Sequence, residues 1–301
     1  MGKIKRNIRY FFARLFLRIA VVIVYFIPLS FFRRWGVLLS RLFYKFSNHY
    51  RNLAYNNLRF VFPEEKEVEK IFYRSSLLLG ENIADTFWFL AYPRRRGNLI
   101  NIEHKEILDW ALSFKRGVIG ITAHIGAFTI LGGALTQQGY KVNCLLRNPR
   151  DEKMAGVLER GLRMQGVRSI FTKPSLKCIE EVLESLKNNE ILIVLIDQRA
   201  GRSGVFVKFF GHYTSVPTGP VIFSLRTGAK IIPMFMIREG QKHNLKIFPE
   251  FKIIYKENIE KTIFENTQNL ILLIEGVIRE YPEQWSWIDR RWNLHIVNKG
   301  G

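Results

Sequence analysis

Apolar and polar residues alternate in blocks along the last two thirds of the chain. Short, continuously apolar runs such as Val118–Ile121 predict buried strands, and apolar residues spaced three or four positions apart predict helices. The predicted strands are 118–123, 141–146, 167–171, 190–196, 230–237 and 245–254. The predicted helices are 51–63, 64–91, 104–114, 127–138, 150–165, 175–187, 218–227 and 258–280. This alternation predicts an α/β fold with a mixed, mostly parallel central sheet flanked by helices.

The first 46 residues have a different pattern. Leu15–Phe32 is almost wholly apolar, with one charge at Arg18, and its 18 residues reach the lower limit of a membrane-spanning helix, roughly 17–25 residues. A signal peptide and an ordinary soluble helix are the alternatives, but bulky and charged residues stand where a cleavage site would need small ones. We favour a membrane anchor, followed by an amphipathic, interfacial helix over Trp35–Phe46. The predicted domains are therefore residues 1–46 and residues 47–301.

The charge distribution supports a membrane location. The net charge is +20, and twelve lysines and arginines precede the first acidic residue, Glu64. Because these cations flank apolar sequence, they favour an anionic membrane over nucleic acid as the partner. The longer basic run after the anchor favours a globular part on the cytoplasmic side. The two cysteines, Cys144 and Cys178, are expected to be reduced core residues, and no metal or other cofactor is expected.

Polar side chains follow three of the predicted strands. His124 follows the first strand, Arg147 the second, and Asp197 with Gln198 the fourth. Because ligands bind at the carboxyl ends of strands in open α/β sheets, these residues are expected to converge there. Histidine titrates near neutrality, which suits His124 to act as a general base, although a core or capping histidine is the alternative.

A glycine-punctuated loop and an apolar hairpin come next. Arg202, Lys208 and the helix start at Thr218 could hold an anion. Phe206, Phe209 and Phe210 belong either to the core or to the wall of a lipid-chain pocket. The sequence contains none of the nucleotide-binding loops, serine-nucleophile turns or zinc-protease motifs that would indicate another chemistry.

The order of several motifs resembles the lipid A biosynthesis lauroyl/myristoyl acyltransferase family, within the lysophospholipid acyltransferase-like superfamily. The motifs are NL…FP at 57–63, HxGxF at 124–128, Arg-Asn-Pro at 147–149, DQ at 197–198, GVFVxFFG at 204–211 and PEQWxWxxRRW at 282–292. The resemblance implies an inner-membrane enzyme that moves a fatty acyl chain from acyl carrier protein, or from acyl-CoA, to a hydroxyl group of a glycolipid or lysophospholipid. It also implies acyl carrier protein and a membrane lipid as partners.

The resemblance assigns roles to particular residues. It makes His124 the base that takes the proton from the acceptor hydroxyl, and it places Arg163, with Arg160 as an alternative, at an acceptor phosphate or at the oxyanion. Arg147, Gln198 and Arg202 would bind substrate. The clustered tryptophans and arginines at 285–292 are interpreted as structural or interfacial rather than catalytic.

Two positions depart from the family pattern. The acidic residue that follows the histidine by five positions is Thr129 here, and the usual asparagine is Ala127. Thr129 could bond the ring itself, another carboxylate could replace the acid, with Asp197 the first candidate, or the chain could be a weak or inactive catalyst that still binds lipid. Asp289 and Asn293 stand where the family often has histidine and lysine, which bears on the acceptor. The acyl chain length, the acceptor and the donor stay open at this stage.

Overall fold

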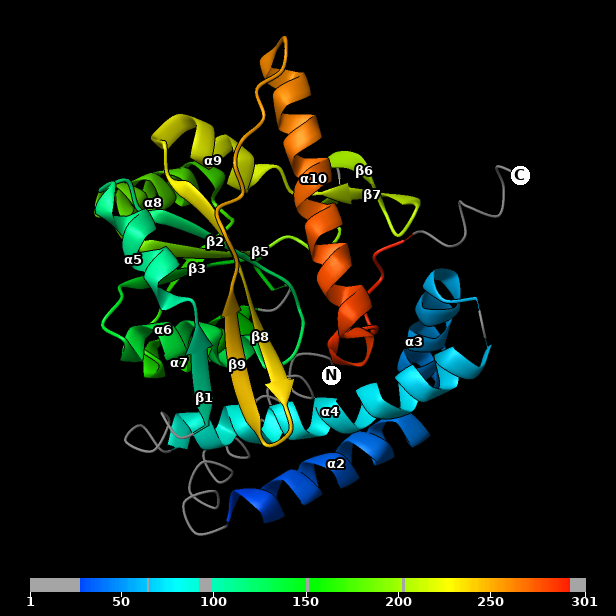
Figure 1. Ribbon diagram of the computed structural model, residues 1–301. Helices are drawn as coiled ribbons and strands as arrows, with labels where there is room; N and C mark the ends of the chain where they lie inside the picture. Colours follow the sequence, from blue (N-terminus) through cyan, green and yellow to red (C-terminus); the bar gives the residue numbers. More distant parts are fainter. Residues whose placement is uncertain (1–27, 64, 92–98, 150–151, 202–203, 293–301) are drawn as a thin grey trace, which may run out of the picture.

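The computed structural model describes residues 28–63, 65–91, 99–149, 152–201 and 204–292 (Figure 1). Seven strands form the central sheet, in the order β1-β9-β8-β2-β5-β3-β4. Their bounds are β1 Ile100–Glu103, β2 Val118–Thr122, β3 Val142–Leu146, β4 Arg168–Phe171, β5 Ile191–Leu195, β8 Lys230–Glu239 and β9 Lys242–Ile247. Neighbouring strands run parallel except β8 and β9, which form an antiparallel pair. The predicted α/β fold with a mostly parallel sheet is confirmed.

Helices cover both faces of this sheet, which explains why its central strands are apolar throughout. Strand β2 is buried along its whole length between β5 and β8. One face packs against α8 Ser175–Lys187, α9 Gly219–Thr227 and α10 Ile259–Glu280, and the other against α5 Lys105–Ser113, α6 Leu131–Gln137 and α7 Glu152–Met164. A strand buried on both faces shows no alternation of polar and apolar residues.

Several predicted boundaries were wrong. Strand β1, at one edge of the sheet, was not predicted, because four residues of mixed polarity give too short a pattern. The strand predicted over 245–254 occupies Lys242–Ile247, after which the chain leaves the sheet apart from one bridge at Phe251. The helix predicted over 127–138 begins as a 3₁₀ turn, η2 Phe128–Ile130, before α6. The predicted apolar hairpin is present as β6 Val205–Phe209 and β7 His212–Val216.

From residue 28 onward, three helices precede the sheet: α2 Leu29–Phe46, α3 Asn48–Val61 and α4 Glu65–Ala91. Helix α4 passes below the sheet in the view of Figure 1, and α2 packs alongside α4. Gly36 and Gly80 lie at the crossing of these two helices, where a Cβ on either one would overlap the carbonyl group of the other. The glycines therefore allow α2 to pack closely against α4.

The predicted membrane anchor, 15–32, lies mostly outside the described residues; its last four residues are the first turn of α2. None of the described helices is long and apolar enough to cross a membrane. The division into domains at residue 46 stays a prediction, although α2 packs on α4 from the predicted second domain.

Candidate active site

The carboxyl ends of neighbouring strands bring His124 and Asp197 together. Strand β2 ends at Thr122, which pairs with Leu195 at the end of β5, so the residues two positions further along each strand are neighbours. The His124 Nδ1 atom lies 2.8 Å from Asp197 Oδ1, and the His124 backbone N–H donates to Asp197 Oδ2 at 3.0 Å. The expected convergence of strand-end polar groups is therefore observed for this pair.

The sharp turn after His124 requires a glycine. Gly126 has a positive φ of 57°, and a Cβ at this position would overlap the carbonyl oxygen of Met236 on β8. The turn pairs with the C-terminal segment 282–292: Gly126 N–H donates to the Gln284 carbonyl at 2.9 Å, and Ser286 N–H donates to the His124 carbonyl at 3.0 Å. These contacts fix the backbone that carries the histidine.

The environment of Asp197 keeps its carboxyl group ionised. Burial alone would raise the pKa of Asp197, but the charge and hydrogen bond of His124, the charge of Arg291 and the hydrogen bond from Trp285 together hold that pKa well below its usual range. An ionised carboxylate only accepts hydrogen bonds, so Nδ1 of His124 carries the hydrogen. In the neutral ring the other nitrogen, Nε2, is then an acceptor, and the Gln198 side-chain amide lies 3.2 Å from it.

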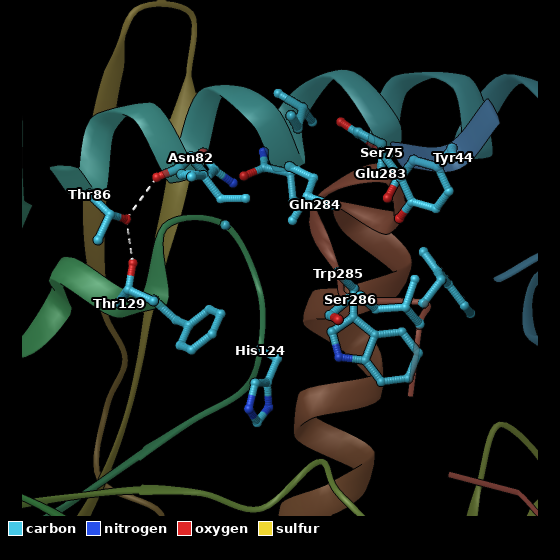
Figure 2. Close-up of a pocket in the computed structure, with 17 residues that line it drawn as sticks. Tyr44, Ser75, Asn82, Thr86, His124, Thr129, Glu283, Gln284, Trp285 and Ser286 are labelled. Carbon is cyan, nitrogen blue, oxygen red and sulfur yellow. Dashed lines mark hydrogen bonds between the residues drawn. The ribbon is translucent and has the colours of Figure 1, made fainter. Parts of the chain in front are cut away.

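His124 lines a cavity of about 230 Å³ between α4 and the C-terminal segment. Figure 2 shows His124 and Trp285 on one side of this cavity and residues of α4 on the other. The apolar part of the lining consists of Leu78, Leu79, Ile83, Phe128, Trp285, Trp287 and Ile288. The polar part includes Tyr44, Ser75, Asn82, Thr86, Thr129 and Glu283. Between Ser75 and Thr86 the cavity follows three turns of α4, about 16 Å at 1.5 Å per residue.

Thr129, at the position of the family's acidic residue, lies against α4 at one end of the cavity. Its hydroxyl group is 2.6 Å from that of Thr86, as the dashed line in Figure 2 shows. The His124 ring instead pairs with Asp197 through Nδ1. Of the three alternatives left open by the sequence, the geometry therefore matches the second, in which Asp197 replaces the missing acid.

This arrangement places an imidazole paired with a carboxylate in the lining of a largely apolar cavity. The comparisons with known proteins give the family. Residues 3–293 match the family described as bacterial lipid A biosynthesis acyltransferase. The chain belongs to this family. It is an acyltransferase, as the sequence resemblance predicted.

Similar proteins carry related names. The lipid A biosynthesis palmitoleoyltransferase of Escherichia coli (strain K12) is 26% identical over 256 residues, which cover 82% of this chain and 80% of that protein. The phosphatidylinositol mannoside acyltransferase of Mycolicibacterium smegmatis is 24% identical over 196 residues, which cover 65% of this chain and 62% of that protein. The two names refer to different glycolipids, so similarity at this level does not fix the acceptor.

The predicted substrate-binding residues of this acyltransferase lie at different distances from the cavity. Gln198 is beside the His124 ring, whereas Arg147 is exposed and donates to the Arg199 carbonyl at 3.3 Å. Arg160 and Arg163 are exposed on α7. Gln165, two residues after Arg163, donates to the Thr129 carbonyl at 3.0 Å, which places the end of α7 next to the cavity. Arg202 lies outside the described residues.

The three phenylalanines of the hairpin separate into two environments. Phe209 and Phe210 are buried in the core against Trp285 and Trp292, and Phe206 is 60% exposed. In the described part of the chain, all three lie outside the cavity lining. Of the two interpretations offered for Phe209 and Phe210, the geometry matches ordinary core. Lys208, predicted to help hold an anion, lies with its ammonium group 5.7 Å from the Tyr213 ring centroid.

Sequence reasoning missed two partners of Asp197. Arg291 is fully buried, and its Nη2 lies 3.2 Å from Asp197 Oδ2; Trp285 Nε1 donates to the same oxygen at 2.8 Å. Both residues belong to the motif PEQWxWxxRRW. A conspicuous motif rich in tryptophan and arginine was the available signal, but 88 residues separate Trp285 from Asp197, and no pattern along the chain pairs them.

Among the residues that the structure describes, no group of three or more histidine, cysteine, aspartate or glutamate side chains could hold a metal ion. The expectation that catalysis needs no cofactor stays a prediction.

Proposed function

We propose that this acyltransferase moves a fatty acyl chain from the thioester of acyl carrier protein, or from acyl-CoA, to a hydroxyl group of a lipid A precursor or related glycolipid. The observation that carries the proposal is the His124 ring, held through Nδ1 by Asp197, in the lining of an elongated and largely apolar cavity. The family and the names of the relatives support a glycolipid acceptor.

In the proposed reaction, Nε2 of His124 takes the proton of the acceptor hydroxyl as the oxygen attacks the thioester carbonyl. The new carbon–oxygen bond forms, and the carbonyl oxygen becomes negative. The intermediate then expels the thiolate, which receives the proton from the imidazolium. Asp197 stabilises the imidazolium and holds the ring orientation, as the aspartate does in a Ser-His-Asp triad.

The remaining residues have supporting roles in this proposal. The Gln198 side-chain amide lies next to Nε2, where it can donate to the carbonyl oxygen as negative charge develops; such donors contribute about 10²–10³ in rate. Arg163, near the Thr129 end of the cavity, would contact an acceptor phosphate. The acyl chain would lie along α4, against Leu79 and Ile83.

One assay tests the proposal. The purified protein is given labelled acyl-carrier-protein and acyl-CoA, with lipid A precursors, phosphatidylinositol mannosides and lysophospholipids as acceptors. We expect turnover that falls by about 10²–10⁴ in His124→Ala, the usual range for loss of a general base. His49→Ala, at an exposed histidine, is the matched control and is expected to keep wild-type activity.

The outcomes separate the alternatives. Turnover unaffected by His124→Ala would contradict the role of that residue, and no turnover on any acceptor would favour a lipid-binding protein on the same scaffold. Thr129→Glu restores the family's acidic residue. Since Asp197 already occupies Nδ1 of His124, we expect no gain from this change; a large gain would show that the native site lacks its acid.

We also propose that the outer face of α2 rests in the surface layer of a bacterial inner membrane, with the catalytic domain on the cytoplasmic side. The helix has three faces. Arg33, Ser40 and Tyr44 are buried toward the protein. The opposite face exposes Phe31, Trp35, Leu38, Leu39, Leu42 and Phe46. Arg34, Arg41 and Lys45 lie between these two faces and are exposed. An outward apolar face bordered by cations is typical of interfacial helices.

Vesicle sedimentation tests this orientation. Burying a large apolar side chain contributes roughly 1.5–3 kcal/mol, so the double variant Trp35→Ser/Leu42→Ser should bind vesicles with anionic lipid at least tenfold more weakly. Trp110→Ser, at an exposed tryptophan on α5, is the matched control. Equal binding by the double variant and the wild type would contradict the proposal.

A further inference from the structure

The C-terminal segment places two hydrogen-bond donors on the carboxylate that faces His124. Oδ1 of Asp197 pairs with the His124 ring, and Oδ2 accepts from Trp285 Nε1 at 2.8 Å and from Arg291 Nη2 at 3.2 Å. Arg291 also donates through Nε to the Asp197 backbone carbonyl at 2.9 Å. One guanidinium therefore contacts both the backbone and the side chain of the same aspartate.

Arg291 is itself held rigidly. Its guanidinium carbon lies 3.8 Å from the centroid of the Trp285 ring, and Nη1 donates to the Ser286 carbonyl at 2.6 Å. The Thr214 hydroxyl on β7 donates to the Arg291 carbonyl at 2.7 Å. Because a buried guanidinium without an anionic partner is strongly unfavourable, Arg291 and Asp197 are expected to keep each other ionised.

We propose that Arg291 and Trp285 are positioning residues for the reaction: they fix the orientation and the charge of Asp197, and through it the His124 ring. This inference rests on the proposed function of His124. It gives the motif PEQWxWxxRRW a part in catalysis, in place of the structural or interfacial role expected from the sequence. Arg291 contacts Oδ2 of Asp197, the oxygen that does not pair with the His124 ring.

The charges around this pair set the expected pH response. The charged groups in contact with Asp197 are His124 and Arg291; Asp289 acts on Arg291, and Glu283 lines the cavity that His124 also lines. Removing the Arg291 cation makes one proton bind more tightly to the His124–Asp197 pair, whichever of the two carries it. The acid limb of the kcat/KM profile should therefore move to higher pH.

The test compares Arg291→Met, Arg291→Lys and Trp285→Phe in the full chain. For Arg291→Met we expect kcat to fall at least tenfold with KM changed less than threefold, and the acid limb to move up by at least half a pH unit. Arg291→Lys keeps the positive charge but loses the paired N–H donors of the guanidinium. The acid limb of the kcat/KM profile should therefore stay in place while kcat falls. Arg290→Met, at the exposed neighbouring arginine, is the matched control and should match the wild type.

A second measurement does not depend on turnover. The ring nitrogens of ¹⁵N-histidine-labelled protein are titrated by NMR, with His124→Ala assigning the signal. Arg291→Met should raise the pH midpoint of His124, and Trp285→Phe should change its Nδ1–H shift. If the wild type shows no turnover, the proposed function fails but this titration still tests the contact.

Two results would overturn the inference. The first is a folded Arg291→Met with the wild-type kcat and the wild-type His124 midpoint. If Arg291→Met does not fold, the second is wild-type kcat together with wild-type ring signals in both Arg291→Lys and Trp285→Phe.

Discussion

Asp197 and Asp85 are both buried aspartates that contact arginine and histidine. The two clusters around them differ in whether the histidine side chain has exposed surface. In the first, His124 keeps 21% of its side chain exposed and is part of the cavity lining. In the second, Asp85 on α4 contacts Arg33 of α2, Arg238 of β8 and His243 of β9, and neither Asp85 nor His243 has any exposed side-chain surface.

The two histidines differ in whether they can exchange a proton with a bound molecule. His124 lines the cavity and keeps part of its side chain exposed, so its ring can exchange a proton with a bound molecule. His243 uses Nε2 to contact Asp85 at 2.8 Å, and its Nδ1 is buried without a hydrogen-bond partner in the described structure. Under the proposed function, the same residue types serve proton transfer in one place, whereas in the other they attach α2 and α4 to the sheet. Access to a cavity, more than composition, distinguishes them.

The largest expected effect comes from Asp197→Asn. An amide directed at Nδ1 favours the wrong histidine tautomer, and the corresponding change in a Ser-His-Asp triad lowers kcat by about 10⁴. We expect kcat/KM to fall by about 10³–10⁴ in the acyl-transfer assay. A loss of less than tenfold in folded protein would show that Asp197 does not orient the base.

The matched change in the other cluster is Asp85→Asn. It takes the shared carboxylate away from the buried Arg33 and from Arg238, which keeps only the Glu81 contact at 3.5 Å among its described carboxylate partners. Loss of one partner from a buried ion pair costs about 3–5 kcal/mol. We expect the free energy of unfolding, measured in urea, to fall by this amount, while the protein that stays folded keeps kcat within threefold. A large loss of kcat at unchanged stability would remove the distinction between the two clusters.

Gly36→Ala tests how α2 reaches the second cluster. The added methyl group would overlap the Gly80 carbonyl, so α2 must move away from α4 and Arg33 with it. Such overpacking typically costs about 1–3 kcal/mol, seen as a lower free energy of unfolding. Gly276→Ala in α10, where a Cβ meets nothing within 4 Å, is the control and should not destabilise.

The smallest expected effect is a pH dependence of stability from His243. Burial lowers the pKa of His243, and the hydrogen bond to Asp85 offsets this only in part. As the pH falls below the unfolded value of about 6.5, the unfolded chain binds the proton first. Stability from this group is therefore complete above pH 6.5 and is lost below it, by at most about 1.4 kcal/mol per pH unit. His243→Gln should flatten this slope in urea titrations between pH 7 and 5; an unchanged slope would contradict the assignment.

The alternation of strands and helices was sufficient to predict the α/β class and most elements, because strands covered on both faces must be apolar along their length. The helix 175–187 and the start of β2 at Val118 agree with the structure to the residue. Strand β1 and the end of β9 were not predictable in this way. Strand β1 is held by its pairing with β9 across more than a hundred positions, and the end of β9 is set by where its pairing with β8 stops; neither is a local pattern.

The same division applies to the site. The sequence alone picked out His124, because a histidine followed by a glycine turn at a strand end is a local feature, and it named Asp197 as one possible partner. Only the tertiary structure decided between Asp197 and Thr129, since the parallel pairing of β2 with β5 sets which carboxylate reaches the ring. The stretch around His124 supplies the imidazole. Asp197, which pairs with the ring, and Arg291, which pairs with Asp197, come from segments about 70 and more than 160 residues away, brought together by the packing of the sheet and the C-terminal segment.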